Sequence, residues 1–334
     1  MAELDVALIG AGGIARTHLP AWTALRAHVR IYAPDDRAPA LAREFGATLA
    51  GTREEAIAGA TVVDVCTPTD THPEIALAAL AAGAHVLCEK PLALTTADAA
   101  LIAGTARAAR LRLYPGHVVR FFPAYARLRD LVADGALGRV AVARFTRTGR
   151  YPTWSPWFAD PARSGGILVD QMIHDFDIAR WLFGEVIRVH AHQRGHLTAP
   201  APDGAVASGT AVLTHESGVI TQVVGVWAPP NTPFRTTFHV SGTGGTLSHD
   251  SLDSPGLRVT GSDRGAAGAA GIPSGDFGES PYTTQIAEFA AAFAGHGPEP
   301  RVSATDGVAA VRIAEAAVAS ARTGQAVALE GSPA

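Results

Sequence analysis

The segment "HVLCEKPLAL" contains the only lysine of the chain, Lys90, which lies between Glu89 and Pro91. The chain has 27 lysine and arginine side chains, and all of them except Lys90 are arginine. A composition that drifts toward arginine should have replaced a lysine whose only role was solvation, although chance survival of one exposed lysine is the alternative. An ammonium group is a compact, rotatable donor whose pKa falls on burial, whereas a guanidinium stays protonated. Such an ammonium can hydrogen-bond a reacting hydroxyl and shift proton density, which makes Lys90 a candidate for that role if other residues of the chain support it.

A second reactive pair is Asp170 and His174 in "LVDQMIHDFD". Residues four apart on a helix share a face, and histidine, with an unperturbed pKa of about 6.5, suits general-base work. An isolated pair of this kind is more often a satisfied, half-buried hydrogen bond. A metal site is the other alternative, but the spacing shows no third ligand, so we expect no metal. Asp177, three residues beyond, is expected to hold the ring or to cap local structure.

A glycine-rich loop, "GAGGIA", follows the first apolar run and precedes a helical stretch. In such a loop Gly10 makes a tight turn, Gly12 lets a pyrophosphate approach the backbone, and the small Ala15 lets the helix pack on the strand. The free N–H groups of the helix N-terminus then attract phosphate. We expect dinucleotide contacts from Gly10, Gly12, Gly13 and Ile14. The alternative, a glycine turn without a ligand, is the weaker interpretation.

The segment after the second apolar run, "VRIYAPDDRAP", bears on the choice between NAD and NADP. Ala33 occupies the position where an acid usually holds the ribose hydroxyls of NAD. Asp35 or Asp36 could reach the ribose instead, and Arg37 could meet a 2′-phosphate. Because the neighbouring acids disfavour that phosphate, the sequence favours NAD slightly over NADP.

Two patterns of elements position these residues. Short β-branched runs alternate with alanine-rich helical stretches from Val6 to about Tyr114, which predicts a doubly wound parallel sheet covered on both faces. After residue 119 come helices over about 123–134 and 172–183, and then consecutive strands that include the hairpin "GTAVLTH-ESG-VITQVV". We therefore predict an α/β Rossmann domain over 1–118, followed by an α+β domain with a largely antiparallel open sheet over 119–334. The span 261–278 is expected to be a loop or flap, and two helices are expected near the end of the chain.

Composition excludes several classes of protein. The chain of 334 residues is 47% hydrophobic and 17% charged, which is typical of a globular protein of two domains. A formal net charge of -4 gives no field that attracts nucleic acid or an acidic membrane. The two cysteines, Cys66 and Cys88, each end an apolar run and are expected to be buried thiols rather than a disulfide. Without a signal sequence or a membrane-spanning run, we expect a cytoplasmic protein.

Five ordered motifs resemble the glucose–fructose oxidoreductase/inositol dehydrogenase (Gfo/Idh/MocA) family. They are "GAGGIA", "CTPTDTH", "AGAHVLCEKPLA", "GHVVRFFPAYARLRDLVADGALG" and "SGGILVDQMIHDFDIARWLFG". The match runs from about residue 5 to residue 184, and "DGVAAVRIAEAAVASARTGQAVAL" also fits. The run "MIHDFDIARWLFGE" resembles inositol 2-dehydrogenases within the family.

The resemblance implies roles for single residues. Lys90 would lie between nicotinamide and substrate, His174 would be the general base, and Asp170 would orient it or bind a neighbouring hydroxyl. Further implied cofactor contacts are Thr67, Pro68, His72, Glu89, Lys90 and His117. The substrate contacts would be Lys90, His117, Tyr151, Trp157, Asp170 and His174.

Several of these implied roles have plainer alternatives. His117 would equally be an ordinary histidine at a strand end, and Tyr151 and Trp157 would more often be core or interface aromatics. Tyr282 is expected to approach the nicotinamide, and Arg163 to reach the cofactor or cap its loop. Thr71 and Glu74 have the spacing of a capping box, which would start a helix irrespective of any ligand.

Together these features predict an NAD(P)-dependent oxidoreductase that transfers hydride to or from a secondary alcohol or hemiacetal carbon of a cyclitol or sugar. The expected partners are a small polyol or sugar and further copies of the chain, in a homodimer or homotetramer. One alternative is an NADPH-dependent reductase of a keto-sugar nucleotide. The other is a non-catalytic regulator that binds a dinucleotide and a sugar, since a fold does not determine function.

Overall fold

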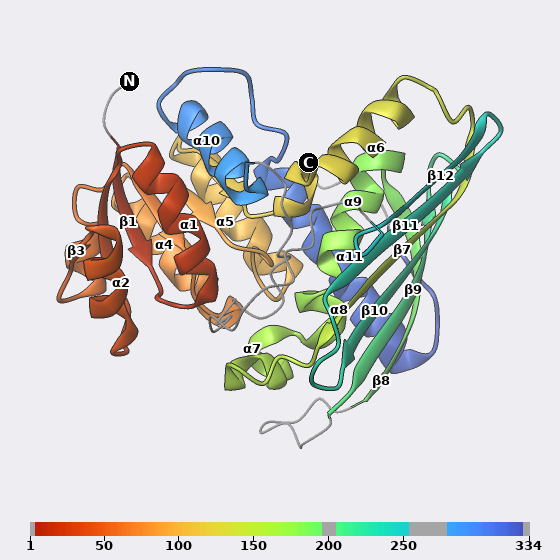
Figure 1. Cartoon of the computed structure of the whole chain (residues 1–334), viewed down its shortest axis with the longest axis horizontal. Helices are drawn as coiled ribbons and strands as arrows, with labels where there is room; N and C mark the ends of the chain where they lie inside the picture. The colour runs from red at the N-terminus through yellow and green to blue at the C-terminus, as the bar shows by residue number, and fades with distance from the viewer. Residues whose placement is uncertain (1–3, 196–204, 254–278, 330–334) are drawn as a thin grey trace. The chain divides into compact units, whose positions relative to one another are not determined.

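The computed structural model describes residues 4–195, 205–253 and 279–329, which divide into two compact units (Figure 1). The first unit lies within residues 1–121 and 279–311, and the second within 122–278 and 312–334. The boundary near 121 is close to the one expected after 118, but residues 279–311 belong to the first unit rather than the second. The loop expected over 261–278 lies outside the described residues. None of the described helices has the length and hydropathy needed to cross a membrane.

The first unit contains a parallel sheet of six strands in the order β3-β2-β1-β4-β5-β6. The strands are β1 (Asp5–Ile9), β2 (His28–Tyr32), β3 (Thr48–Leu49), β4 (Val62–Val65), β5 (His85–Cys88) and β6 (Leu113–Pro115). The helical segments are α1 (Gly13–Ala24), α2 (Arg37–Phe45), α3 (Arg53–Ile57), the 3-10 turn η1 (Thr69–Thr71), α4 (His72–Ala81), α5 (Thr96–Ala108), the 3-10 turn η2 (Val118–Phe121) and α10 (Pro281–Phe293). This strand order is the doubly wound Rossmann arrangement, so the predicted fold class is confirmed. Only the exposed two-residue strand β3 was not expected.

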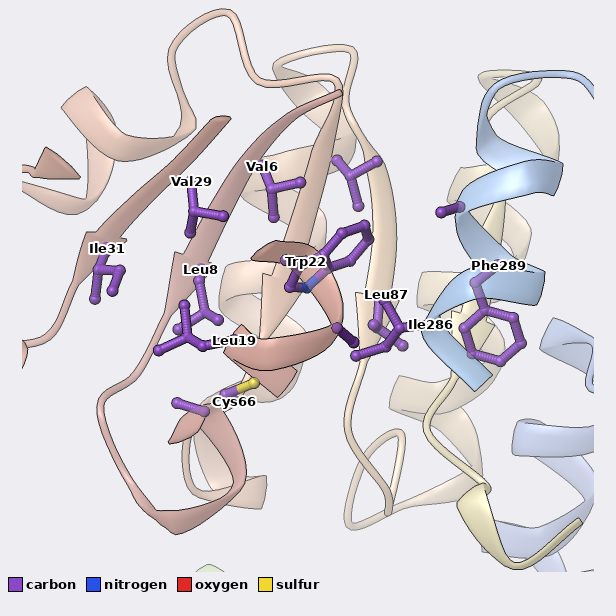
Figure 2. Close-up of a cluster of buried hydrophobic side chains, with 14 of the residues drawn as sticks. Val6, Leu8, Leu19, Trp22, Val29, Ile31, Cys66, Leu87, Ile286 and Phe289 are labelled. Carbon is purple, nitrogen blue, oxygen red and sulfur yellow. The ribbon is translucent and has the colours of Figure 1, made fainter. Parts of the chain in front are cut away.

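Helix α10 completes the core of the first unit, although it is far away in the sequence. Ile286 and Phe289 from α10 are fully buried in one cluster with Trp22 and Leu87 (Figure 2). The ring of Phe289 stacks on Tyr114 of β6 with a centroid distance of 5.0 Å. The hydrophobic face of a helix shows that it needs a partner surface but does not specify which one, and this explains why the sequence placed α10 in the other domain. Both cysteines are buried free thiols, as predicted.

The second unit contains a seven-stranded sheet in the order β12-β11-β7-β10-β9-β8-β13. The strands are β7 (Val140–Arg150), β8 (Val186–Gly195), β9 (Ala207–His215), β10 (Ile220–Ala228), β11 (Arg235–Gly242), β12 (Gly245–Asp250) and β13 (Val327–Ala328). All neighbours are antiparallel except β7 and β10, which run parallel. The predicted hairpin is β9–β10, and the largely antiparallel sheet is confirmed.

Helices pack on one face of this larger sheet. They include α6 (Pro123–Ala133), α8 (Gly166–Asp170) and α9 (Ile173–Phe183), which lie on the same side of the sheet in Figure 1. Short segments η3 (Pro156–Ala159) and α7 (Pro161–Ser164) precede α8, and α11 (Ala304–Thr323) follows α10. Arg147 of β7 and Asp175 of α9 form a buried two-point ion pair with both N···O distances at 2.9 Å. Because removal of one partner of such a pair costs about 3–5 kcal/mol, it anchors α9 to the sheet.

Candidate active site

The glycine loop crosses closely over the neighbouring strand at the carboxyl edge of the parallel sheet. Gly10 has φ of +112°, and a Cβ atom there would lie 2.5 Å from the carbonyl oxygen of Cys66 at the end of β4. Both the backbone conformation and the contact exclude any larger residue. Gly10 therefore brings the β1–α1 turn against β4, at the point where the strand order reverses and doubly wound sheets bind ligands.

The first turn of α1 leaves donors available for an anion. Gly12 is the N-cap and provides no side-chain cap, and the first hydrogen bond within the helix runs from the Arg16 N–H to the Gly12 carbonyl. A Cβ atom at Gly12 would meet no atom within 4 Å, so there is space beside the loop. The N–H groups of Gly13 and Ile14 precede that first bond and have no partner within the helix. The loop thus fits the pyrophosphate of a dinucleotide by its own geometry.

In the segment after β2, Asp35 and Arg37 are hydrogen-bonded to each other. They were the competing candidates for contact with the cofactor ribose and with its 2′-phosphate. Oδ1 of Asp35 accepts hydrogen bonds from the backbone N–H and from Nε of Arg37, each at 3.0 Å. The Arg37 hydrogen bonds lower the pKa of Asp35 despite some burial. The guanidinium therefore already has an anionic partner, so its charge is partly neutralised for a 2′-phosphate.

The loop after β4 is tied to the lysine segment by His72. Its Nδ1 lies 2.8 Å from the Pro91 carbonyl oxygen and its Nε2 lies 2.9 Å from the Thr67 carbonyl oxygen. Burial lowers the pKa of His72, so the neutral ring carries one N–H and can donate to one of these carbonyls at a time. The backbone thus occupies both ring nitrogens that were expected to face the cofactor. Thr67 and Pro68 themselves are half-buried at the end of β4.

The expected capping box at the start of α4 is wrong. Thr71 is the N-cap of α4 but makes no side-chain cap. Its hydroxyl instead donates to the Pro68 carbonyl (2.7 Å) and approaches the Thr67 hydroxyl (2.8 Å). Glu74 pairs with Arg53 of α3 at 2.6 Å. The Thr-x-x-Glu spacing shows only that a capping box is possible. Here the Thr71 hydroxyl bonds to Pro68 and Thr67, and Glu74 pairs with Arg53, so neither side chain forms the cap.

Lys90 directly follows β5 at the same carboxyl edge, and it is half-buried. Its backbone N–H donates to Oε2 of Glu89 at 3.1 Å. The Glu89 side chain is buried, and its other oxygen faces inward toward His18 of α1, at 3.3 Å from Nε2. Glu89 therefore supports the lysine segment from inside the first unit.

His117 lies at the adjacent strand end, after β6. The N–H of Gly116 donates to the Cys88 carbonyl oxygen at 2.8 Å. A Cβ atom on Gly116 would lie 2.5 Å from Oε1 of Glu89, so a glycine is required for the two segments to approach. His117 is buried. The carboxyl edge of the sheet thus brings together the glycine loop and the segments that carry Thr67, Lys90 and His117.

The helix expected over 172–183 is α9 (Ile173–Phe183), but Asp170 lies outside it, so the premise that Asp170 and His174 lie on one continuous helix is wrong. Helix α8 ends at Asp170 and α9 begins at Ile173. At this break the N–H of Met172 bonds to the carbonyl of Ile167 (3.0 Å), five residues back. Asp170 is buried and His174 is half-buried.

Two glycines of the second sheet make room for this break. Gly209 of β9 and Gly225 of β10 are direct partners in the strand register. A Cβ atom on Gly209 would lie 2.6 Å from Sδ of Met172, and one on Gly225 would lie 2.5 Å from Cγ of the same side chain. Met172 thus lies over the two glycines, and this packing sets where Asp170 and His174 are placed. A glycine inside an otherwise β-branched strand is the sequence signal for such a close approach.

The remaining candidates divide between core and surface. Tyr151 is buried in a cluster with Ile167 and Trp227, and its ring meets the Trp227 ring edge-on with a centroid distance of 5.6 Å. It therefore packs as a core aromatic, which was the alternative to a substrate contact. Trp157 is half-buried and stacks on Phe158 at 3.9 Å. Arg163 of α7 is also half-buried. In the first unit, Tyr282 at the start of α10 lies with its ring centroid 6.0 Å from that of His18.

A buried polar cluster beneath the glycine loop was missed by the sequence interpretation. His18, Asp64 and Cys66 are all buried, and their ligand atoms lie within 4.8 Å of one another, a spacing that a metal ion could use. Hydrogen bonds among the three account for this spacing, and burial raises the pKa of the Cys66 thiol, which keeps it protonated. The available signal was the acid inside the apolar run "VVDVC", because an acid in a fully buried strand needs a partner.

The parallel sheet, its glycine loop and the donors at the start of α1 define a Rossmann fold of the dinucleotide-binding type, followed by a second α+β unit. Residues 4–117 match the oxidoreductase family with an NAD-binding Rossmann fold, and residues 125–248 match the GFO/IDH/MocA C-terminal domain. The chain therefore belongs to the GFO/IDH/MocA family of oxidoreductases, as its motifs predicted.

Known relatives cover almost the whole chain. The 1,5-anhydro-D-fructose reductase of Ensifer adhaerens is 33% identical over 305 residues, which is 88% of each chain. The inositol 2-dehydrogenase of Rhizobium meliloti (strain 1021) is 30% identical over 323 residues, or 94% of this chain and 95% of the relative. Among solved structures, GenD2 from gentamicin A biosynthesis in complex with NAD has a TM-score of 0.86 and 30% identity, and the match covers 99% of this chain and 97% of GenD2.

Proposed function

We propose that this protein interconverts a secondary alcohol or hemiacetal carbon of a cyclitol or sugar with the corresponding carbonyl, using a nicotinamide dinucleotide. The observation that carries the proposal is the carboxyl edge of the parallel sheet, where Gly10, Lys90 and His117 follow three strands of one rigid sheet. The relatives named as an anhydrofructose reductase and an inositol dehydrogenase support a polyhydroxylated ring as the substrate class.

In the oxidative direction the substrate hydroxyl loses its proton and the carbon that bears it loses a hydride. Bound NAD supplies the hydride acceptor. Nζ of Lys90 hydrogen-bonds the reacting oxygen and stabilises the negative charge that develops on it, a contribution of several kcal/mol for a preorganised donor. A ring nitrogen of His174 receives the hydroxyl proton. The Asp170 carboxylate orients that ring or holds a neighbouring hydroxyl of the substrate.

We propose NAD rather than NADP as the preferred dinucleotide. The Asp35 carboxylate lies three residues beyond the end of β2, on the side of the sheet edge that faces the ribose in this fold. It holds Arg37 through two hydrogen bonds at 3.0 Å, which reduces the attraction of that guanidinium for a 2′-phosphate. The solved structure of GenD2 in complex with NAD supports the same choice.

We also propose that the protein works as a homo-oligomer through the exposed face of the second sheet. The residues of β7, β9 and β10 that point away from the helices are largely β-branched, and Val212 and Ile220 are 36% and 44% exposed. A sheet face that exposes β-branched side chains, with Val212 and Ile220 among them, can pair with the same face of another copy.

The decisive experiment is an absorbance assay at the reduced-nicotinamide band with NAD or NADP and a panel of inositols, aldoses and their keto products, in both directions. We expect turnover with one substrate class by the wild type. Lys90→Ala should lose turnover by about 10²-fold or more, the size of effect seen when one preorganised donor is removed. It should still bind NADH with wild-type affinity in a fluorescence titration.

Two controls make the result specific. Lys90→Arg keeps a positive charge but not a compact donor, and it should be nearly as inactive as Lys90→Ala. Normal turnover by Lys90→Ala would refute the role of the lysine. Dinucleotide binding without turnover across the panel would favour the regulator, and turnover of a keto-sugar nucleotide with NADPH would favour the reductase.

A further inference from the structure

A row of buried charged groups leads from the middle of the parallel sheet to Lys90. Asp64 of β4 and His18 of α1 are 0% exposed, and Glu89 at the end of β5 is 6% exposed. Oδ2 of Asp64 lies 3.0 Å from Nδ1 of His18. On the other side of the same ring, Nε2 lies 3.3 Å from Oε1 of Glu89. One imidazole ring is therefore placed between two carboxylates inside the first unit.

The surroundings of His18 favour its charged form. Burial alone lowers the pKa of a histidine, but Asp64 and Cys66 together outweigh burial, and the pKa of His18 is raised well above its usual value. The imidazolium then carries an N–H on each ring nitrogen. Nδ1 is hydrogen-bonded to Asp64, and Nε2 lies close enough to the Glu89 carboxylate for an ion pair. Two more buried donors hold Asp64 itself, namely Nε1 of Trp22 at 2.7 Å and Sγ of Cys66 at 3.3 Å; Trp22 and Cys66 are both labelled in Figure 2.

Glu89 passes this support to the lysine. While Oε1 of Glu89 faces His18, Oε2 accepts the backbone N–H of Lys90 at 3.1 Å. The absence of a side chain at Gly116 leaves the space in which this carboxylate lies. The Glu89 carboxylate therefore faces the His18 ring with one oxygen and holds the Lys90 backbone with the other.

We propose that His18 is a positioning residue, which holds the Glu89 carboxylate, and through it the Lys90 backbone, in the geometry that hydride transfer requires. The proposal rests on the proposed function, in which Lys90 hydrogen-bonds the reacting oxygen. It also connects two parts of the site, because His18 lies in the second turn of α1, the helix whose N-terminus faces the pyrophosphate. The Asp64 carboxylate sets the ring orientation and charge, and the donors of Trp22 and Cys66 stabilise Asp64.

Two amide substitutions separate the two sides of the ring. The amide of Asn reaches about as far as Nδ1 of histidine, so His18→Asn keeps a partner for Asp64 and loses the contact to Glu89. The amide of Gln reaches about as far as Nε2, so His18→Gln keeps a polar group beside Glu89 and loses the contact to Asp64. Both variants remove the buried charge and should lower the melting temperature to a similar extent.

The first measurement uses the single lysine of the chain. Protein labelled with ¹⁵N-lysine shows one backbone amide cross-peak, that of Lys90, whose position reports the hydrogen bond to Glu89. We expect this peak to move upfield in the proton dimension in His18→Asn and to stay near its wild-type position in His18→Gln. Trp22→Phe, which removes one donor to Asp64 without touching Glu89, is the matched control and should lower stability but leave the peak in place.

The second measurement compares kcat with the Kd for NADH in each variant, with myo-inositol and 1,5-anhydro-D-fructose as the substrates. A small misplacement of a catalytic group can cost about 10–100-fold in rate, so we expect that loss in kcat for His18→Asn, with an unchanged Kd for NADH. His18→Gln should stay within about threefold of the wild type, because it keeps the contact that positions Glu89.

A third variant covers the case in which His18→Asn does not fold. Asp64→Asn has the same shape but no charge, so it removes a carboxylate that favours the charged form of His18 and weakens the ion pair between His18 and Glu89. We expect Asp64→Asn to move the Lys90 peak in the same direction as His18→Asn. Equal peak positions in His18→Asn, Asp64→Asn and the wild type would overturn the proposal, whether or not either substrate is turned over. Failure of the proposed function is distinguishable, because it would appear as no turnover across the panel or as a Lys90→Ala variant as active as the wild type, whereas the peak positions are read without substrate.

Discussion

Single residues of one type take different roles in this protein because their neighbours differ. His18 and His72 are both fully buried in the first unit. A carboxylate beside His18 raises its pKa, whereas His72 meets only backbone carbonyl oxygens at hydrogen-bond distance and burial lowers its pKa. The first is an imidazolium between acids, and the second is a neutral bridge between two loops. Neither difference can be derived from the residue type.

At the same scale, Asp35 is expected to control the choice of dinucleotide. In Asp35→Ala the ribose loses an acceptor, so NADH should bind about 10–100-fold more weakly, which is the loss expected for one charge-assisted hydrogen bond. Arg37 also loses its partner, so NADPH should bind more tightly. Fluorescence titration with each dinucleotide measures both changes. Asp36→Ala, at the exposed neighbouring acid, is the control and should leave both affinities unchanged. An unchanged preference in Asp35→Ala would contradict the assignment.

At the scale of elements, a helix terminus anchors a buried arginine. Arg120 of η2 is 1% exposed, and its Nη1 donates to the Arg301 carbonyl oxygen (2.6 Å) and to Oδ2 of Asp306 (3.2 Å) in the first turn of α11. Ser303 also donates to Asp306 through its N–H and its hydroxyl, both at 2.8 Å. Burial alone would raise the pKa of Asp306, but Arg120 and Ser303 outweigh it and the pKa is lowered.

This ion pair should make the stability of the protein sensitive to acid. The carboxyl of an unfolded aspartate has a pKa of about 3.9, and the folded value is lower, so the stabilisation is complete above that pH and is lost as the pH falls toward the folded value. Asp306→Asn should lower the free energy of unfolding near neutral pH by about 3 kcal/mol. Its stability should then decline less than that of the wild type between pH of about 5 and 3.

Urea unfolding at several pH values measures this difference. The control is Asp36→Asn, which changes an exposed acid in the same unit and should decline with pH as the wild type does. Parallel declines in Asp306→Asn and the wild type would show that another group governs the acid sensitivity.

At the scale of the whole molecule, the exposed face of the second sheet is the feature that points beyond one chain. Ile220 pairs in register with Val142 and Thr214, so β-branched side chains lie side by side across three strands. We expect the wild type to be a dimer or tetramer by size-exclusion chromatography with light scattering, and Val212→Glu/Ile220→Glu to shift it toward the monomer, because burying two carboxylates is costly. Leu101→Glu, at a residue of the first unit that is 55% exposed, is the control and should not change the mass. A wild type that is already monomeric would refute the oligomer.

The sequence by itself determined the fold class, the glycine loop, the lysine segment and the family. These features are encoded locally: a buried parallel strand is an unbroken apolar run, the turn after β1 requires glycine at residue 10, and Lys90 is the only lysine. The candidate residues Thr67, Lys90 and His117 were named from the resemblance of their motifs to the family, and in the structure each lies just beyond the end of a strand.

The tertiary structure alone decided which distant segments meet. It placed α10 in the core of the first unit, broke the helix between Asp170 and His174 over two paired glycines, and assembled the buried row from Asp64 to Glu89. A sequence pattern shows that a helix face needs a partner or that a buried acid needs a donor, but not which residue supplies it. That choice depends on the packing of side chains far apart in the chain, where a Cβ atom at Gly209, Gly225 or Gly116 would force the neighbouring side chain to shift.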